Sequence, residues 1–558
     1  MMFLYMKKTM SLIAATLASI AVSGQEIYDN ARLLATDLNG TARYVGMGGA
    51  MEALGSDIST MGTNPAGIAL MRRSSASVSF GVNTLRGVQS IDDFNKTRMS
   101  FNQAGFVYSM RPDRSSFVNI GVNYTKSADF GSILTAADRL GNASQNKLSA
   151  LKNYKGAYLL SANGGKLTSP DAAFSQADYL YANSVLNNST SQLTDANGNA
   201  ISGSDEGYLV SQQPDGSYIP SFYNASDYSY AYGGKGYIGQ YDFNISGNCH
   251  DRVYWGLSFG LYDVHYHNAS SYQENLIDGA NSIGSTTLFD ERKITGTGFD
   301  IKAGIIVRPF DGSPLRIAAY VHTPTWYDLN TKNITALQNN LEQGYGNDSY
   351  RGRILSSTED YDYKFYTPWR FGVSLGHTVG NYLAFGATYE YADYSTSDIR
   401  VNDGGYYDDF GYHESSSSDR AMKTGIKNVL RGVSTFKVGV EYKVMPDIAV
   451  RLGYNYVSPM YRTDGYKDGT LSSPSTYYSS TTDYVNWKAT NRLTAGVGGA
   501  YRHFTIDLAC LYSKTNGIFY PFMSYADPQN NYSLDNGCNG VQVSQSSYRL
   551  MLTLGYRF

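Results

Sequence analysis

The chain has 558 residues, with 50 Tyr, 57 Gly, 17% charged residues and a formal net charge of −3 at pH 7. This balance lacks the basic surface of a nucleic-acid-binding protein, so nucleic acid is excluded as a partner. The three cysteines are far apart and odd in number, and no disulfide framework is expected. Beyond the N-terminus, no stretch approaches the roughly 18 apolar residues of a membrane helix, which leaves an exported soluble protein or one inserted as strands.

The N-terminal residues have the pattern of an export signal. Lys7 and Lys8 precede an apolar run at 10–22, and small residues follow it before Gln25. We therefore expect residues 1–24 to be a signal peptide that is removed on export. Since no cysteine follows the apolar run, a lipoprotein anchor is not expected.

Residues 25–73 form a glycine-rich segment without strand periodicity, ahead of the first predicted strand. Its glycines, among them Gly48, Gly49 and Gly67, permit tight turns in a confined space. Pro65 forces Asn64 into an extended backbone, and the Asn64 side chain can bond to nearby backbone groups. By itself this pattern also fits a simple proline turn that leads into the first strand.

The C-terminal "SYRLMLTLGYRF" shows the clearest strand pattern in the chain. Its apolar side chains alternate with a second set that includes Arg549, Thr553 and Arg557, and period two puts the two sets on opposite faces. A face with two arginines cannot lie in a dry core. We expect that face to meet water and the apolar face to meet hydrocarbon.

The same alternation recurs along the chain and predicts fourteen strands. They lie at 74–85, 100–111, 115–127, 237–248, 251–268, 293–309, 313–326, 359–377, 381–398, 431–444, 446–459, 487–502, 503–515 and 545–558. Short links alternate with long ones, which is the arrangement of an outer-membrane barrel with tight turns at one end and long loops at the other.

The predicted fold is therefore all-β, a fourteen-stranded antiparallel transmembrane barrel. Lipid cannot satisfy exposed backbone groups, so a sheet spans a membrane only when it closes on itself. Such a barrel is wider than the eight-stranded kind that side chains fill, and left empty it would leak. Residues 25–73 precede the first strand and are predicted to be an N-terminal hatch, a plug in the lumen, with 74–558 forming the barrel.

The long connections are predicted to be polar extracellular loops, and the largest is an insertion at 127–236. At that length it is expected to fold over the barrel mouth, with structure of its own. Within it, Ser169, Pro170 and Asp171 mark a helix start. Apolar residues follow at helical spacing, namely Phe174, Ala177, Leu180 and Tyr181. The polar stretch 402–419 is predicted to be a solvated loop.

The N-terminal motif carries a specific resemblance. "GMGGAMEALGSDISTMGTNPAGIAL", followed by fourteen strands and a terminal Phe558, resembles the FadL/OmpP1/TodX family of outer-membrane transporters for hydrophobic compounds. The family's hatch carries an Asn-Pro-Ala motif after a glycine-rich stretch with an aspartate, here Asn64, Pro65 and Ala66 after Asp57. "LRIAAYVHTPTWYDL" and "YKFYTPWRFGVSLG" are similar to strand segments of the same family.

The resemblance implies passive uptake across the outer membrane of a Gram-negative bacterium. A hydrophobic molecule would bind at the outer loops and enter the barrel, and a shift of the hatch would open its route. The hatch and gating residues would be Asn64, Pro65, Ala66, Gly67, Gly48, Gly49 and Asp57. Release in the family can be lateral, at a kinked third strand, where Gly121 and Asn123 are the candidate bend.

The resemblance also implies the partners of the chain. They are a hydrophobic small molecule, outer-membrane lipid and the barrel-assembly machinery, which would engage the strand that ends at Phe558. A monomer without cofactor or metal is expected, and the residues that bind the ligand are not identified by the sequence.

Two groups of polar residues have a structural and a functional interpretation. Asp263, His265 and His267 share one strand face and could hold a metal, but no fourth ligand is evident and the structural interpretation is favoured. Inward-facing charges could bind a carboxylate, but such groups usually pair with one another and anchor a plug; they are Arg370, Glu390, Glu441, Arg451 and Arg549.

Three other functions compete with hydrophobic transport. A polar-solute porin would have an open lumen and no hatch, and a loop-displaying adhesin would not depend on Asn64 to Ala66. A barrel enzyme such as a lipase needs a nucleophile, a base and an orienting group in register. Gly-X-Ser-X-Gly occurs twice, at 256–260 and 372–376, but both matches lie inside predicted strands and not at the strand-to-helix turn that a serine nucleophile needs. The sequence contains no His-Glu-X-X-His, and an enzyme is not expected.

Overall fold

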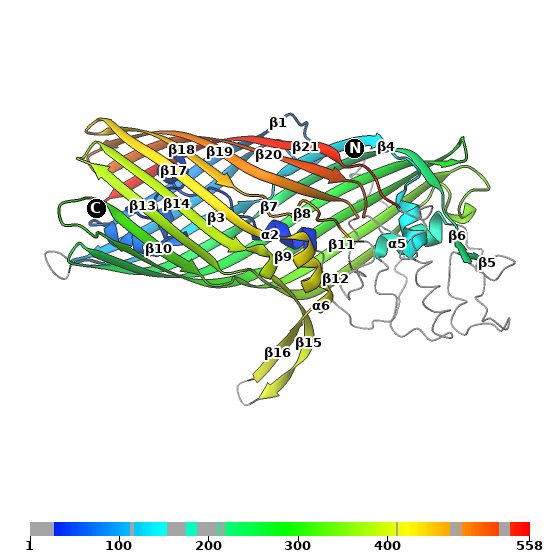
Figure 1. Ribbon diagram of the computed structural model, residues 1–558, viewed down its shortest axis with the longest axis horizontal. Coiled ribbons are helices and arrows are strands. Elements are labelled where there is room, and N and C mark those ends of the chain that lie inside the picture. The colour runs from blue at the N-terminus through cyan, green and yellow to red at the C-terminus, as the bar shows by residue number, and fades with distance from the viewer. Residues whose placement is uncertain are drawn as a thin grey trace.

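The strands close into one antiparallel β-barrel, seen from the side in Figure 1. The computed structural model describes residues 27–111, 116–152, 175–186, 210–212, 218–408, 411–468, 478, 482–523 and 536–558. The first and last strands close the barrel, because β1 (Ser75–Arg86) pairs with both β2 (Thr97–Met110) and β21 (Val541–Arg557). The expected signal peptide, residues 1–24, lies outside the described residues.

Fourteen strand positions surround the barrel, which confirms the predicted fold class. Besides β1, β2 and β21, the uninterrupted ones are β7 (Asn224–Cys249), β8 (Val253–Asp278), β9 (Asn281–Val307), β17 (Gly432–Met445), β18 (Ile448–Val457), β19 (Tyr484–Tyr501) and β20 (Phe504–Tyr520). Four positions are broken into two strands each: β3 (Val118–Asp129) and β4 (Ser132–Arg139), β10 (Arg316–His322) and β11 (Trp326–Leu341), β12 (Ile354–Tyr366) and β13 (Arg370–Val379), and β14 (Leu383–Asp393) and β15 (Asp398–Asp408).

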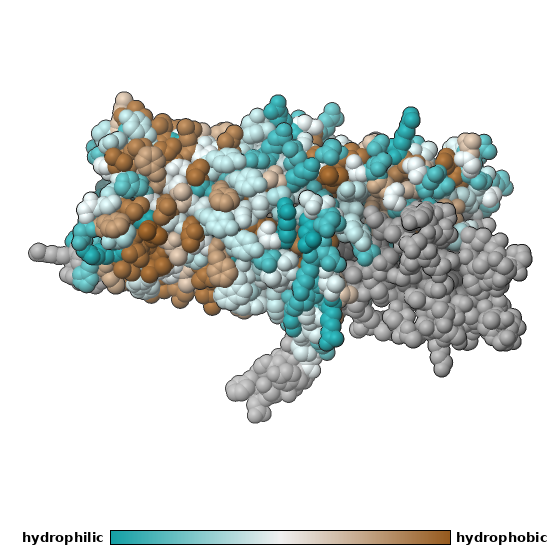
Figure 2. Space-filling model, viewed as in Figure 1, coloured by the Kyte–Doolittle hydropathy of each residue, from teal (hydrophilic) through white to brown (hydrophobic). Residues whose placement is uncertain are grey.

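Alternate residues of the strands form an apolar belt on the outside of the barrel. In the last strand, Leu550, Leu552 and Leu554 are 57%, 37% and 45% exposed, whereas Met551 and Thr553 are buried inside. Figure 2 shows the belt over the half of the barrel that carries the C-terminus. A closed barrel with this belt, tight turns at one end and long loops at the other is the architecture of a bacterial outer-membrane protein.

Several strands continue well beyond their predicted ends. β7 begins at Asn224, β8 runs to Asp278 and β9 begins at Asn281. Outside the belt the pattern inverts: Tyr228 is buried inward, while its neighbour Ser229 faces water. Strand prediction from apolar outer faces therefore misses the parts of these strands that lie outside the belt. The predicted insertion 127–236 accordingly contains strand residues at both of its ends.

The described part of that insertion contains one of the long-loop helices. α5 (Gln176–Ser184) is capped by Ser175, whose side chain accepts from the Asp178 N–H while Asp178 accepts from the Ser175 N–H. The predicted helix is thus present, but its predicted start at 169–171 and Phe174 lie outside the described residues. Smaller elements of the long loops are β5 (Val210–Gln212), β6 (Tyr218–Pro220) and η3 (Asp348–Tyr350).

The stretch predicted as a solvated loop at 402–419 is instead largely a β-hairpin. β15 pairs with β16 (Gly411–Ser418), and the hairpin projects sideways from the barrel wall (Figure 1). It is followed by α6 (Arg420–Val429), which has Asp419 as its N-cap. Met422 and Ile426 of α6 are buried against apolar residues inside the barrel. The polar composition concealed both elements, because neither has the alternating apolar face that identifies a lipid-facing strand.

The N-terminal segment Ile27–Leu70, called the plug below, lies inside the barrel (Figure 1). It contains α2 (Ile27–Leu34), α3 (Ala42–Gly46), η1 (Ile58–Gly62) and η2 (Pro65–Leu70). Nearly all of its side chains are buried, and α3, η1 and η2 contact strands around the wall. No helix of the described residues is long and apolar enough to span a membrane.

Candidate functional site: the plug and the cavities beside it

The Asn-Pro-Ala motif begins the last turn of the plug. Asn64 is fully buried, and its Oδ1 accepts the Ala66 N–H at 3.1 Å, so Asn64 caps η2. Its Nδ2 donates to the Glu52 carbonyl at 2.8 Å and ties η2 to the preceding turn. Pro65 occupies the first helical position, where its missing N–H costs nothing. The motif therefore sets the local shape of this part of the plug.

Glycines of the barrel wall make room for the motif. A Cβ at Gly304 would overlap Asn64 Oδ1, and a Cβ at Gly256 would overlap the Pro65 carbonyl group. The same close approach of plug backbone to wall occurs at Gly386, Gly439 and Gly453. These contacts explain why inward positions of the strands carry glycine. The sequence pattern alone does not show which part of the molecule these glycines contact.

The other predicted hatch residues shape the plug itself. Gly48 and Gly49 have φ of +63° and +77°, a left-handed turn that follows α3 and favours glycine. Asp57 caps η1 and accepts the Thr41 hydroxyl at 2.8 Å. Gly67 packs directly on Thr60, where a Cβ would come within 2.6 Å of the hydroxyl. All of these residues lie together in the part of the plug nearest the tight turns.

Buried ion pairs join the plug to the wall at that level. The Glu441 carboxylate accepts two hydrogen bonds from the guanidinium of Arg43 in the plug, at 2.9 and 3.0 Å. It accepts a third from Arg451 Nε at 2.6 Å. Arg451 also pairs with Asp507 at 2.6 Å. The inward charges Glu441 and Arg451 thus pair with each other and with the plug, and each charge is compensated in a low-dielectric site.

A second buried pair holds the middle of the plug. Glu52, fully buried, accepts Lys437 Nζ at 2.8 Å and the Thr388 hydroxyl at 2.7 Å from the wall. Tyr44 of the plug donates to the same carboxylate at 3.1 Å. The plug is therefore connected to one arc of the barrel, from β14 through β17 to β18, by two carboxylates with several donors each.

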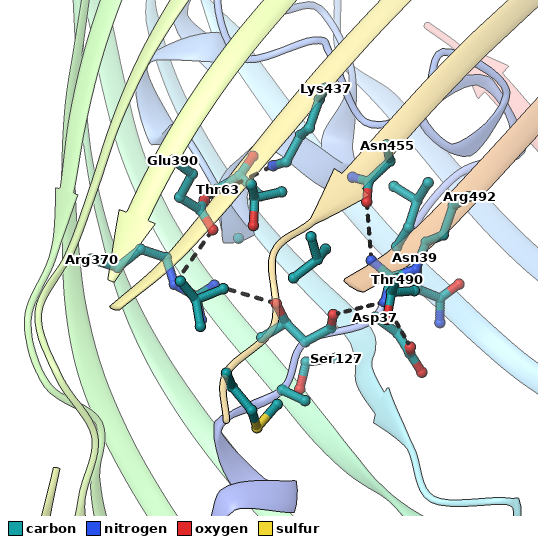
Figure 3. A pocket seen from close by; sticks show the side chains of 18 of the residues that line it. Asp37, Asn39, Thr63, Ser127, Arg370, Glu390, Lys437, Asn455, Thr490 and Arg492 are labelled. Carbon is teal, nitrogen blue, oxygen red and sulfur yellow. Dashed lines mark hydrogen bonds and ion pairs between the residues drawn. The ribbon is translucent and has the colours of Figure 1, made fainter. Parts of the chain in front are cut away.

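A cavity of about 160 Å³ lies on the other side of the plug, toward the long loops (Figure 3). Arg370 and Arg492 extend into it from different strands, toward the plug residues Thr36 and Asp37. Their contacts there are long: 3.5 Å from Arg370 to Thr36 Oγ1 and 3.6 Å from Arg492 to Asp37. Arg370 also pairs with Glu390 at 3.6 Å. Apolar residues line the rim of the cavity, namely Val433, Val457, Met460 and Trp487.

A smaller cavity of about 60 Å³ adjoins the first and shares several of its residues, namely Ala35, Thr36, Gly62, Ser127, Gln240, Arg370 and Tyr394. It lies between the end of α2 and the wall formed by the third to ninth strand positions. The two cavities together surround the extended plug residues after α2. Sequence reasoning identified none of these cavity residues as a group, because they come from distant strands.

The third strand is irregular, although not at the candidate bend. Pairing of β3 with β2 and β7 continues through Gly121 and Asn123 without a register shift. The register against β7 shifts instead between Lys126 and Ala128, and the strand breaks at 130–131. The physical reason is that Gly121 is hydrogen-bonded into the sheet between β2 and β7. Pairing on both sides keeps its backbone extended, although glycine could adopt a bend.

A stretch of β3 is paired by the plug instead of by β2. The β2 ladder ends at Thr125, and beyond it the Asp37 N–H donates to the Ser127 carbonyl at 2.8 Å. The Asp129 N–H returns a bond to Asp37 Oδ2 at 3.0 Å. On the wall side, Arg98 of β2 reaches over the break and pairs with Asp129 at 3.1 Å. The gap between the second and third strands is thus filled by a side chain and a plug segment.

The histidine group on β8 has local partners. His265 lies 2.9 Å from Asp263, and His267 lies 2.9 Å from Glu291. Across the described ranges, no three His, Cys, Asp or Glu side chains are placed to hold a metal ion. At the other end of the barrel, the Phe558 N–H bonds to the Ser74 carbonyl at 2.9 Å, and its ring lies against Tyr556 and Phe106.

Comparison with known proteins gives similarity at the level of structure. No protein-family model matches the chain, and neither does any curated protein. Among solved structures, a Pseudomonas aeruginosa FadL homologue is 11% identical with a TM-score of 0.48, the Ralstonia pickettii toluene transporter TbuX is 13% identical with 0.44, and the Pseudomonas putida toluene transporter TodX is 12% identical with 0.43. Each alignment covers 94% of this chain and 99% of the other. At these identities and TM-scores, the similarity does not identify a compound that this chain transports.

Proposed function

We propose that the chain is an outer-membrane channel for passive uptake of hydrophobic small molecules, either long-chain fatty acid-like or aromatic. The observation that carries the proposal is the plug, which fills the tight-turn side of a lipid-belted barrel and leaves a cavity on the side of the long loops. In this proposal residues 25–73 act as a hatch. A ligand held in the cavity moves on when the plug shifts.

Hydrophobic cargo suits this arrangement better than polar cargo. An apolar solute gains little from a water-filled pore and much from continuous apolar contact, and lateral release into lipid spares it rehydration. The larger cavity, about 160 Å³, has room for a benzene-sized molecule, which would contact the apolar rim of Val433, Val457, Met460 and Trp487 beside the charged Arg370 and Arg492. The gap in the ladder beside the third strand is occupied by Arg98 and by the plug, so release at that place would require both to move.

The alternatives receive less support. A polar-solute porin needs an open lumen, and here the plug packs against wall glycines across it. The projecting hairpin β15–β16 would suit an adhesin, and its deletion would test that function without touching the plug. An enzyme is not proposed. The proposal further includes a monomer without cofactor, and recognition of the terminal strand and Phe558 by the barrel-assembly machinery.

The proposed hatch is tested by the double variant Asn64→Ala with Pro65→Ala. Removing the cap and the proline should disorder η2 without changing any wall residue, so insertion continues while gated uptake fails. The measurement is uptake of labelled oleate and labelled toluene by cells that lack competing transporters. Folding is checked by gel electrophoresis, in which a folded barrel changes its mobility when the sample is heated. We expect uptake to fall at least tenfold.

Asn347→Ala is the matched control, since Asn347 caps the exposed turn η3 in the way that Asn64 caps η2. The control should import at the wild-type rate. Uptake by the double variant that equals wild type would refute the hatch. A wild-type protein that imports neither compound would refute the transport function itself.

A further inference from the structure

Two neighbouring strands of the wall break at the same level, each at a Thr-Pro dipeptide. β10 stops at His322 and β11 resumes at Trp326; β12 stops at Tyr366 and β13 resumes at Arg370. These are the strand segments "LRIAAYVHTPTWYDL" and "YKFYTPWRFGVSLG". Neither break is needed to close the barrel, because the ladder is continuous on both sides of it.

The two prolines face each other across the breaks. The register of the two strands is the same below and above, which places Pro324 opposite Pro368. Neither residue has an N–H to donate to the ladder. The strands are held at this point by Thr325 and Thr367: the Thr325 N–H bonds to Thr367 Oγ1 at 2.7 Å, and the Thr367 N–H bonds to the Thr325 carbonyl at 3.1 Å.

The next strand breaks at the same place, and the plug contacts the edges of these breaks. β14 ends at Asp393 and gives way to η4 (Tyr394–Thr396). The Tyr394 hydroxyl donates to the Leu34 carbonyl of α2 at 3.0 Å. His322 Nε2, at the end of β10, lies 2.6 Å from the Thr63 carbonyl of the plug. A shift of the plug would therefore release contacts on both sides of the proline pair.

A cavity lies directly behind the breaks. The smaller, 60 Å³ cavity is lined by four residues of the broken segments, namely Thr323, Thr325, Thr367 and Pro368. It adjoins the larger cavity, with which it shares several lining residues. Backbone pairing of the wall is thus interrupted where an internal cavity approaches it.

The outside of the same wall belongs to the apolar belt. Phe299, Trp369 and Phe371 surround the breaks and are 45%, 49% and 54% exposed. Trp326 packs against Phe299 with the rings tilted by 36° and their centroids 5.0 Å apart. Exposed aromatic side chains at this density lie at the lipid boundary of a barrel. A molecule that passed between the prolines would move from the cavity directly into lipid.

We propose that the paired Thr-Pro breaks, Thr323–Thr325 and Thr367–Trp369, form a lateral portal for uncharged apolar molecules. Widening it requires loss of the Thr325–Thr367 bonds, whereas parting a regular ladder of that length would strand more backbone donors in lipid. Threonine and proline at the opening offer no counter-charge, so an ionised solute would pay a large desolvation cost there. The portal rests on the proposed transport function and places release at the seventh and eighth strand positions instead of the third.

A reversible cross-link tests the portal. The variant Thr325→Cys with Thr367→Cys places two thiols across the opening, on facing positions already joined by a hydrogen bond. The matched control, Ile317→Cys with Leu375→Cys, links directly paired residues of the same two strands within the regular ladder. Both pairs are made in a background in which serine replaces Cys249, Cys510 and Cys538.

Uptake of labelled toluene is measured in cells before and after oxidation and again after reduction. We expect oxidation to lower the rate at least tenfold in the Thr325–Thr367 pair and reduction to restore it, while the Ile317–Leu375 pair stays within twofold. Unchanged uptake in the oxidised portal variant overturns the portal and leaves the transport function standing. Equal losses in both pairs also overturn it, because the effect is then general stiffening of the wall.

A labelling measurement gives a readout that does not depend on transport. The purified protein in lipid bilayers is irradiated with a small photoactivatable aryl diazirine, and labelled residues are mapped by mass spectrometry. We expect the inward residues Thr325 and Pro368 to be labelled in the reduced Ile317–Leu375 control protein. Labelling confined to the outer aromatic residues overturns the portal even if uptake occurs.

Discussion

The plug is held in two different ways along its length. The part nearest the tight turns, from α3 to η2, is fixed by short ion pairs to the wall, such as Arg43 with Glu441 at 2.9 Å and Glu52 with Lys437 at 2.8 Å, and by backbone contacts with wall glycines. The extended part after α2 lies between two cavities; it bonds to β3 through Asp37, and the charge pairs of Asp37 with Arg492 and Arg549 are long, at 3.6 Å each. Short, fully compensated pairs resist separation far more than long, partly solvated ones. Motion of the plug should therefore begin beside the cavities.

The largest effect is expected at the most deeply anchored charge. Glu441→Gln leaves Arg43 and Arg451 without their shared carboxylate, and loss of one partner of a buried ion pair costs about 3–5 kcal/mol. The plug should move out of its position in the lumen. Cells should then become sensitive to large antibiotics, and the purified protein in planar bilayers should conduct ions steadily.

Glu342→Gln is the control for that variant, because Glu342 is an exposed loop carboxylate. A Glu441→Gln protein with wild-type conductance would show that glycine contacts alone seat the plug. The contrast between the two parts of the plug would then rest on packing and not on charge.

An intermediate effect is expected from overfilling the glycine contacts. Gly386→Ala places a Cβ against the Ala50 carbonyl, and overpacking of this kind costs about 1–3 kcal/mol. We expect a lower melting temperature in detergent and partial leakage in bilayers. Gly499→Ala is the matched control, because its Cβ would meet nothing within 4 Å. Equal melting temperatures for the two variants would contradict close seating of the plug.

The smallest effect is expected at the loosely held part. Asp37→Asn keeps the side-chain shape and an amide oxygen that can accept the Asp129 N–H, and it removes the charge attraction to Arg492 and Arg549, which at 3.6 Å is worth up to about 1 kcal/mol. Folding should be unchanged and uptake of labelled oleate should rise about two- to threefold, since opening becomes easier. Asp464→Asn, at an exposed pair with Arg462, should change neither. Slower uptake in Asp37→Asn would mean that this contact supports transport instead of restraining it.

The belt was predictable because lipid imposes a strict rule on sequence. Alternation at Leu550, Leu552 and Leu554 identifies both a strand and its outer face, and fourteen such segments suffice for the barrel. Alternation of this kind is required only where a strand contacts hydrocarbon. The strands β7, β8 and β9 were therefore predicted too short at their ends toward the long loops. The hairpin β15–β16 and α6 were missed for the same reason, since they are built outside the lipid.

The amino-acid sequence by itself determined the strand number, the face of each strand that meets lipid and the presence of a compact segment before the first strand, because these follow from local periodicity and composition. Only the tertiary structure decided which wall glycines receive the plug, which arginines share Glu441 and where facing prolines interrupt the ladder. Those features depend on the register between strands that are distant in the chain. Register is a property of the closed sheet as a whole and leaves no periodic trace in any one segment.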